Sequence, residues 1–251
     1  MSAISGTSRR VLAQTGMELR LSLRNAESLI VTFGIPLVLL VFFSLVDVLP
    51  LDGRPPVEFL LPGVLALSVM SSSMVSLGIA TGFERFYLVL KRLGATPLRR
   101  GELVIAKVLG VLAIEAVQIA VVLAIALLGL GYETPSADPP LWLAPVAVVL
   151  GTAAFAGMGL AMAGRLRAVG TLALANTIYL ALLLVGGIAI PLERLPGPLA
   201  STARILPSAP LVELLRAAFG GSTQFVGIDL AILSAWAVAM TALAATTFRW
   251  E

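Results

Sequence analysis

Six long apolar stretches recur along this chain, and each has the length of a membrane-spanning helix. They cover roughly residues 29–49, 59–81, 103–131, 141–164, 169–190 and 227–247. About 20 apolar residues in a helix cross the ~30 Å hydrocarbon layer of a bilayer. Within lipid each segment must satisfy its own backbone hydrogen bonds, which a helix does. The sequence therefore predicts an all-α integral membrane protein with six transmembrane helices.

The composition leaves little material for a soluble domain. Hydrophobic residues make up 59% of the chain, charged residues 12%, and the mean hydropathy is +1.01, whereas soluble domains carry about 25% charged residues. The segments outside the spans, 1–28, 82–102 and 191–226, are shorter than the ~40 residues below which a domain needs external support. We expect a single transmembrane domain over residues 1–251, with a cytoplasmic or interfacial helix at 1–28, a six-span bundle at 29–247 and a tail at 248–251.

The basic residues sort to one side of the predicted membrane. With the N-terminus inside, thirteen lie on the inner face: Arg9, Arg10, Arg20, Arg24, Arg85, Lys91, Arg92, Arg99, Arg100, Lys107, Arg165, Arg167 and Arg249. Four lie on the other face: Arg54, Arg194, Arg204 and Arg216. The positive-inside rule therefore predicts two cytoplasmic termini in a multi-pass protein of the cell membrane, the plasma or inner membrane in bacteria. The net charge of +3 then reflects topology, and no nucleic acid partner is expected.

The N-terminal segment has the pattern of a helix lying at the membrane surface. Leu12, Leu19 and Leu23 share one helical stripe, with basic residues to one side. Such a helix lies in the plane of the lipid headgroups. A basic tail that only sets topology is the alternative.

Several kinds of chemistry are excluded by residue type. The chain has no Cys and no His, so zinc sites of the usual His/Cys kind and His-based catalytic triads cannot form. The acidic residues are scattered singly, with no paired Asp cluster to hold Mg²⁺. The phosphate-binding pattern G-x-x-x-x-G-K-[ST] is missing as well. We expect that the chain is not an enzyme and binds no cofactor or metal.

The segment between the second and third spans carries the most distinctive pattern. Residues 84–93 fit a short helix with an apolar edge and charged ends, and Gly94 and Pro97 would end it. A rigid cytoplasmic helix is what a soluble partner needs to push on a membrane protein. A basic loop held on anionic headgroups is the alternative.

Two motifs resemble one family of membrane proteins. The run Leu90-Lys-Arg-Leu-Gly-Ala-Thr-Pro-Leu98, preceded by Glu84-Arg85, resembles the cytoplasmic loop of ABC type-2 exporter permeases, the family of the daunorubicin-resistance membrane subunit. Gly187-Ile-Ala-Ile-Pro-Leu-Glu-Arg-Leu-Pro196, followed by Leu206-Pro207, Pro210 and Glu213-Leu-Leu-Arg216, is similar to the segment between the fifth and sixth spans of that family. One departure is that relatives often carry Gly-Thr where this chain has Leu88-Val89.

The resemblance implies a permease that pairs with a separate ATPase subunit, with two copies of each in the working transporter. The second permease would be identical or a divergent sibling, and ATP and Mg²⁺ would bind to the partner ATPase. The helix after the second span would dock on the ATPase. Its coupling residues would be Glu84, Arg85, Leu90, Lys91, Arg92 and Leu93.

Residues 191–226 are predicted to form an outer gate. The resemblance implies two short re-entrant helices here, and irregular backbone at membrane depth is tolerated only where protein or water covers it. The residues assigned to this gate are Pro191, Leu195, Pro196, Pro207, Pro210 and Arg216. An exterior loop stiffened by proline is the alternative.

Glu115 is the ionisable residue deepest within a predicted span, about 12 Å beyond Lys107 at 1.5 Å per residue. Such a group must face the bundle interior, a water-filled path or a partner. We predict a substrate pathway of Glu115, Gln118 and Asn176, the last as a cross-helix partner. A hydrogen-bonded clamp between helices is the competing interpretation.

The function that follows is the membrane subunit of an ATP-driven exporter. Its cargo would be an amphiphilic or apolar molecule, drug-like or lipid, because the spans hold few charges. Membrane lipids surround it as further partners. Two other classes stay open: a proton-coupled secondary transporter that uses Glu115, and an intramembrane lipid-modifying enzyme.

Overall fold

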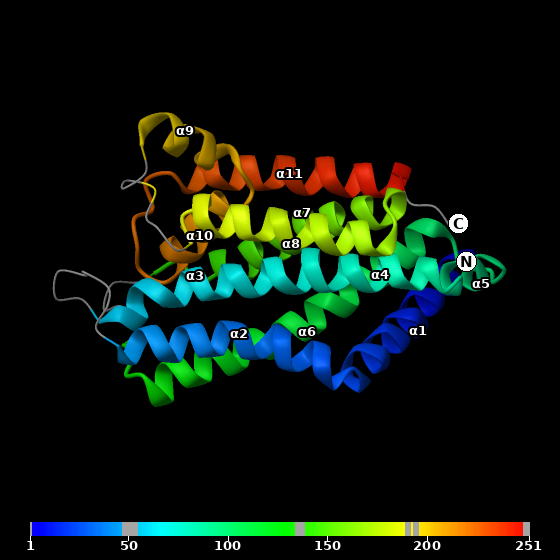
Figure 1. Cartoon of the computed structure of the whole chain (residues 1–251), viewed down its shortest axis with the longest axis horizontal. Coiled ribbons are helices and arrows are strands. Elements are labelled where there is room, and N and C mark those ends of the chain that lie inside the picture. Colours follow the sequence, from blue (N-terminus) through cyan, green and yellow to red (C-terminus); the bar gives the residue numbers. More distant parts are fainter. Residues whose placement is uncertain (1, 47–54, 134–138, 189–191, 193–195, 248–251) are drawn as a thin grey trace.

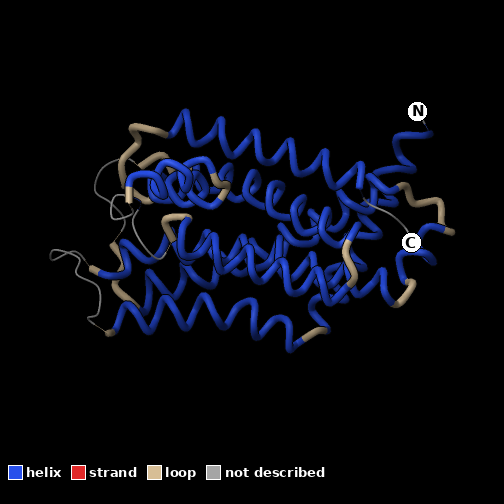
Figure 2. The backbone as a smooth tube through the Cα atoms, turned by 45° about the horizontal axis from the view of Figure 1, so that its top comes forward, coloured by secondary structure: helices blue, strands red, loops and turns tan. Residues whose placement is uncertain are grey.

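The computed structural model describes residues 2–46, 55–133, 139–188, 192 and 196–247. Every regular element within these residues is a helix, and no strand occurs among them (Figures 1 and 2). The long helices run along one axis, and the loops gather at its two ends (Figure 2). One end carries the short helix α5 and the other carries α9 and α10 (Figure 1); we call them the α5 end and the α10 end. The predicted all-α class is confirmed.

Each predicted span corresponds to a helix of the structure. In chain order these helices are α2 (Ala26–Leu45), the continuous set α3 (Pro56–Met70), η1 (Ser71–Ser76) and α4 (Leu77–Phe86), then α6 (Arg100–Gly129), α7 (Leu143–Arg165), α8 (Ala168–Val185) and α11 (Val226–Thr247). The shorter helices are α1 (Ser2–Arg24), α5 (Val89–Gly94), α9 (Gly197–Ile205) and α10 (Ser208–Ala218).

Within the described residues, five helices are long and apolar enough to cross a membrane on their own. A sixth candidate arises when Gly6–Arg24 and Leu29–Leu45 are taken together, a pair bent by 69°. The bend lies at Asn25, whose carbonyl oxygen accepts the backbone N–H of Leu29 at 3.1 Å. Asn is a favoured helix N-cap, so a new helix starts here in a new direction. The prediction of a multi-span membrane bundle is confirmed.

Two of the spans are longer than a bilayer requires. Pro56–Phe86 has 31 residues and Arg100–Gly129 has 30, which at 1.5 Å per residue gives about 45 Å for each helix, against a hydrocarbon layer of ~30 Å. Apart from Glu58 at the start of α3 and Glu115 within α6, the charged residues of both helices lie at the α5 end. The end of α4 and the beginning of α6 can therefore extend beyond the lipid and carry α5 with them.

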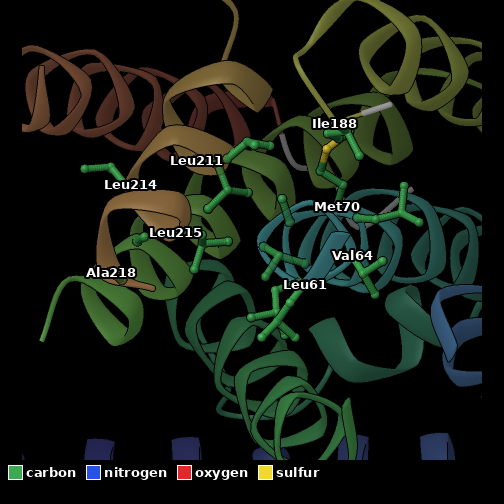
Figure 3. Packing of buried hydrophobic residues seen from close by; sticks show 14 of the residues in the cluster. Leu61, Val64, Met70, Ile188, Leu211, Leu214, Leu215 and Ala218 are labelled. Carbon is green, nitrogen blue, oxygen red and sulfur yellow. The ribbon is translucent and has the colours of Figure 1, made fainter. Parts of the chain in front are cut away.

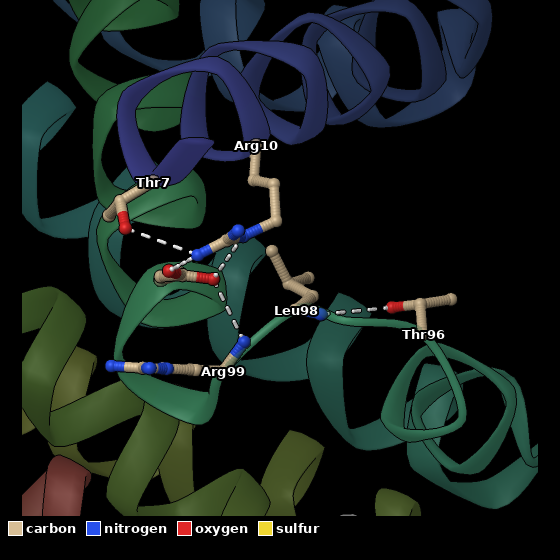
Figure 4. Close-up of polar contacts among 6 residues, drawn as sticks. Thr7, Arg10, Thr96, Leu98 and Arg99 are labelled. Carbon is tan, nitrogen blue, oxygen red and sulfur yellow. Dashed lines mark hydrogen bonds and ion pairs between the residues drawn. The ribbon is translucent and has the colours of Figure 1, made fainter. Parts of the chain in front are cut away.

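Helix α1 packs against the beginning of α6 with its polar side. The Arg10 guanidinium donates two hydrogen bonds to Glu102, from Nε to Oε2 at 3.1 Å and from Nη2 to Oε1 at 2.6 Å (Figure 4). Glu102 Oε2 also accepts the backbone N–H of Arg99 at 2.9 Å, which caps α6. Leu12 and Leu23, by contrast, are exposed. The predicted apolar stripe thus faces outward while polar contacts hold α1 to the bundle.

A buried ion cluster joins α1, α4 and α6. The Lys107 ammonium is 1% exposed and lies 3.0 Å from Glu18 Oε2 and 2.8 Å from Glu84 Oε2. Gln14 Nε2 donates to the other oxygen of Glu18 at 2.8 Å. A buried charge is tolerated only when it is paired and hydrogen-bonded, so these three helices are fixed in register.

The largest apolar core lies toward the α10 end, where α10 is inserted among the spans. Leu211, Leu214 and Leu215 of α10 are fully buried and belong to one cluster with Leu61 and Met70 of α3 (Figure 3). Helix α10 packs against α3, α7 and α11. This burial fits the predicted helix among the spans and contradicts a wholly exterior loop.

Close approach between α7 and α11 requires a glycine. A Cβ added at Gly157 would lie 2.5 Å from the carbonyl carbon of Met240. Since small residues let membrane helices approach closely, Gly157 fixes the tightest part of this contact.

We expect Lys107→Met to destabilise the protein by about 3–5 kcal/mol, because it leaves Glu18 and Glu84 buried without a counter-charge. Denaturant unfolding of the purified protein in detergent measures this loss. The triple variant with Glu18→Gln and Glu84→Gln should recover most of it. Lys91→Met, at an exposed lysine of α5, is the control and should change the stability by no more than about 0.5 kcal/mol. Equal losses for the two lysine variants would contradict the ion cluster.

Candidate functional site

The short helix α5 is set apart from α4 by a sharp backbone break. Helix α4 ends at Phe86 and α5 spans Val89–Gly94. Leu88 between them has φ 59° and ψ 19°, the left-handed conformation. The prediction of one continuous helix over residues 84–93 is therefore wrong, because a left-handed residue ends α4 and turns the chain. Glycine adopts this conformation without strain, whereas leucine does not.

One side of α5 is anchored in the bundle. Leu90 is 1% exposed and belongs to an apolar cluster with Leu77 of α4, Leu103 of α6 and Leu160 of α7. Leu93 packs against the same cluster. Interiors packed in this way transmit displacement. A force on α5 therefore reaches three spans.

The other side of α5 is exposed and basic, and the adjacent end of α4 adds two exposed aromatic residues. Lys91 and Arg92 are exposed, and so are Phe86 at 68% and Tyr87 at 64%. Phe86 and Tyr87 form an edge-to-face pair with ring centroids 5.2 Å apart. Exposed aromatic and Arg side chains dominate protein interfaces. Phe86 and Tyr87 were both missing from the coupling residues predicted here, although an aromatic pair at the end of an apolar span was a signal for them.

Glu84 and Arg85 contact the chain itself. Glu84 pairs with Lys107, and Arg85 Nη2 donates to the carbonyl oxygen of Leu166 at 2.7 Å. Leu166 directly follows α7, so Arg85 ties the end of α4 to the α7–α8 connection. The prediction that all four charged residues of 84–93 face a partner is therefore corrected. Lys91 and Arg92 are exposed, whereas Glu84 and Arg85 bind to the parts of the chain on which α5 rests.

Glu115 lies in the middle of the bundle and is fully buried. Ser72 Oγ lies 3.0 Å from Glu115 Oε1, and Thr152 Oγ1 contacts Glu115 Oε2. These partners belong to η1 and α7, so the carboxyl group joins three helices. This geometry, with the side chain fully buried, matches the clamp interpretation.

Ser72 lies in the π-helical segment η1. Ser68 and Ser72 direct their hydroxyl groups to carbonyl oxygens one turn earlier, Ser68 to Val64 O at 2.9 Å and Ser72 to Ser68 O at 2.6 Å. Such bonds compete with the helical ladder, and π-turns occur frequently at functional sites.

The other two residues of the predicted pathway do not join Glu115. Gln118 Nε2 donates to the carbonyl oxygen of Thr32 at 2.8 Å and so ties α6 to α2. Asn176 is exposed on α8 and bonds to Leu172 O of its own helix at 2.9 Å. The expected pairing of Asn176 with Glu115 is wrong, because Thr152 of α7 occupies that role.

The predicted gate residues are distributed around α9 and α10. Pro196 caps α9, while Pro207 and Pro210 lie in or next to the first turn of α10, where a missing backbone N–H is tolerated. Arg216 Nη2 donates to Gly187 O at 2.8 Å, and its guanidinium lies 5.1 Å from the centre of the Phe59 ring. Arg216 thus holds α10 against the chain after α8 and against α3. Pro191 and Leu195 lie outside the described residues.

Comparison with protein families assigns the chain. The model of the family described as "ABC-2 type transporter" matches residues 10–219. No curated protein sequence matches the chain. The chain belongs to the ABC-2 type transporter family. It is therefore a multi-pass membrane protein and the permease subunit of an ABC transport system, and this family implies association with an ABC ATPase subunit. The narrower likeness to the daunorubicin-resistance subunit stays a prediction.

Replacing Leu88 with Gly should stabilise the protein by about 0.5–1 kcal/mol. A left-handed conformation costs an L-residue about 1–2 kcal/mol. Part of the stability gained by removing this cost is lost again, because glycine loses more conformational entropy on folding than leucine does. Leu88→Val should be destabilising, because a β-branched residue fits this conformation worse. Thermal unfolding in detergent compares the two variants, and a more stable Val variant would contradict the turn.

Replacing Glu115 separates the clamp from the pathway. Glu115→Gln should fold and export normally, because an amide can both donate to and accept from the two hydroxyl groups. Glu115→Leu removes two interhelical hydrogen bonds and should cost about 1–2 kcal/mol, given ~0.6 kcal/mol for an average bond of this kind. Denaturant unfolding in detergent and vesicle export assays measure the two effects. Loss of export in a stable Gln variant would instead support the pathway.

Proposed function

We propose that this permease is the membrane half of an ATP-driven exporter and that α5 receives the mechanical stroke of the ATPase. The observation that carries the proposal is the two-sided character of α5. Its outer side presents Lys91, Arg92 and the adjacent Phe86 and Tyr87 to solvent, and its inner side fixes Leu90 in the bundle. A helix of this kind suits both docking and the transfer of force.

A rigid element is required for this transfer. A domain movement shifts the equilibrium between inward and outward states only if the contact differs in free energy between them, and a flexible loop would absorb the displacement. The apolar contacts of Leu90 and Leu93 with α4, α6 and α7 supply the stiff connection. The ion cluster around Lys107 extends it to α1.

The same geometry supports one orientation of the chain in the membrane. Arg85, Arg99, Arg100 and Arg165 all lie at the α5 end of their helices. The positive-inside rule places this end in the cytoplasm, where an ATPase can reach it and where both termini would lie. ATP and Mg²⁺ would bind to that partner.

The cargo class is inferred from the surfaces that the chain leaves open. Helices α8 and α11 bury little of their apolar surface within the chain, so lipid or a second permease covers them. A second permease, identical or a sibling, would complete a pathway between two copies. The apolar character of these surfaces favours an amphiphilic or apolar molecule, drug-like or lipid, as cargo.

Co-purification from the native membrane tests the partners. We expect an ATPase with a phosphate-binding loop and a second permease to accompany this chain. Export by the isolated chain with a proton gradient and no ATP would favour a secondary transporter instead, and product formation by the isolated chain would favour an enzyme.

A double charge reversal tests the docking role of α5. Lys91→Glu with Arg92→Glu should abolish ATP-driven export and substrate stimulation of the ATPase, because both residues are exposed on α5. The fold should persist, since neither side chain belongs to the apolar cluster. Arg165→Glu with Arg167→Glu is the matched control, because these exposed residues lie at the same end outside α5. Undiminished export in the α5 variant would overturn the assignment.

A further inference from the structure

A cavity of about 150 Å³ with both polar and apolar lining residues lies behind the bend between α1 and α2. The bend forms one wall, and η1 with α4 and α6 form the others. Its polar lining includes Glu18, Ser22, Asn25, Ser76, Glu84 and Lys107. Leu29, Val111 and Ile114 line its apolar part. The cavity therefore offers charged and hydroxyl groups beside an aliphatic wall.

The charges that face this cavity do not balance. Glu18 and Glu84 supply two carboxylates, and Lys107 supplies one ammonium at 3.0 and 2.8 Å. The nearest other ion pair of α1 and α6, Arg10 with Glu102, is balanced within itself. With all three groups ionised, the lining carries one negative charge in excess on carboxylates that are mostly but not fully buried, with Glu18 13% and Glu84 21% exposed. Such a charge is costly unless a positive group neutralises it.

One acceptor in the cavity also lacks an aligned donor. Glu84 Oε2 is buried and lies at ion-pair distance from Lys107, yet among the described residues it accepts no well-aligned hydrogen bond. Buried polar atoms in proteins nearly always find a partner. Beside Lys107 this oxygen therefore has room for one further donor, and the excess negative charge of the lining favours a donor that is positively charged.

The size and lining of the cavity restrict that donor. About 150 Å³ is half of the smallest typical drug site of ~300 Å³, so a whole drug-sized molecule does not fit. The described residues contain no group of three acidic side chains that could hold a metal ion. A primary ammonium has three N–H donors and can meet carboxylate and hydroxyl oxygens together. The first methylene groups of an alkyl chain would pass along Leu29 and Ile114.

We propose that this cavity binds the primary ammonium head group of an amphiphile. The amphiphile is either a membrane lipid that carries an amine or an amine-bearing cargo. The site needs only the fold of this chain, so it does not rest on the proposed export function. Its position beside the bend opens it to molecules that reach the bundle at the level where α2 begins.

Binding of dodecylamine to the whole permease tests the proposal. The protein is reconstituted in nanodiscs of phosphatidylcholine, whose head group has no N–H, and heat of binding is measured against empty nanodiscs. We expect saturable binding of dodecylamine. Dodecyltrimethylammonium and dodecanol should bind at least tenfold more weakly, because they lack the charged N–H donors.

Three variants locate the site. Glu18→Gln removes one carboxylate and should weaken dodecylamine binding about tenfold or more, since hydrogen bonds to charged groups are the strong ones. Ala80→Leu fills the cavity from its exposed rim without touching the ion cluster and should weaken binding likewise. Glu58→Gln, at an exposed glutamate at the start of α3, should leave it unchanged. If Glu18→Gln fails to fold, Ala80→Leu decides alone.

Nanodiscs that contain phosphatidylethanolamine distinguish the two sources. Weaker apparent binding of dodecylamine in these discs identifies an amino lipid as occupant, and unchanged binding identifies a free amphiphile. The proposal is overturned if dodecylamine binds to discs that contain the permease no better than to empty discs. That result is expected if a proton, and not an ammonium group, neutralises the carboxylates. The proposal is also overturned if dodecanol binds as strongly as dodecylamine. The same holds if the Ala80→Leu variant binds dodecylamine as strongly as the unaltered protein does.

Discussion

The burial of Lys107 between Glu18 and Glu84 is the interaction on which the arrangement of the α5 end depends. A single ammonium 1% exposed can persist there only because carboxylates from α1 and α4 meet it. The pairing fixes the register of these three helices relative to one another. A second pair, Arg10 with Glu102, repeats the attachment of α1 one and a half turns away along α6. Without these charges α1 would be an amphipathic helix free to lie on the membrane.

The long helices give this attachment its mechanical meaning. The second span and α6 are each about 15 Å longer than the hydrocarbon layer requires, at 1.5 Å per residue. Their extra length at the α5 end holds α5 on a stiff base, with Leu90 packed into it. Apolar packing and ion pairs have different roles here. The apolar cluster supports α5, and the ion cluster joins α1 to the end of α4 and the beginning of α6. A partner that moves α5 would move both together.

The candidate site shows which signals a sequence carries and which it does not. Lys91, Arg92, Leu90 and Leu93 could be placed on a short helix from their spacing, because amphipathic periodicity is local. The left-handed turn at Leu88 could not, since leucine is a poor residue for that conformation and only the constraint of α4 and α5 imposes it. Glu84 and Arg85 are equally instructive. Their charges suggested an exposed helix. In the structure, however, Glu84 pairs with Lys107, 23 residues away, and Arg85 binds the carbonyl oxygen of Leu166, 81 residues away.

Helix positions and class were determined by the sequence alone, because apolar runs of bilayer length allow one backbone structure in lipid. The sequence also contained the reason for the bend at Asn25 and for the first turns of α9 and α10. The tertiary structure decided which polar residues meet. It gave Glu115 the hydroxyl groups of Ser72 and Thr152 instead of Asn176, buried α10 among the spans, and turned the leucines of α1 outward. These outcomes depend on helix rotation and register, which are set by contacts between distant segments and not by any local pattern.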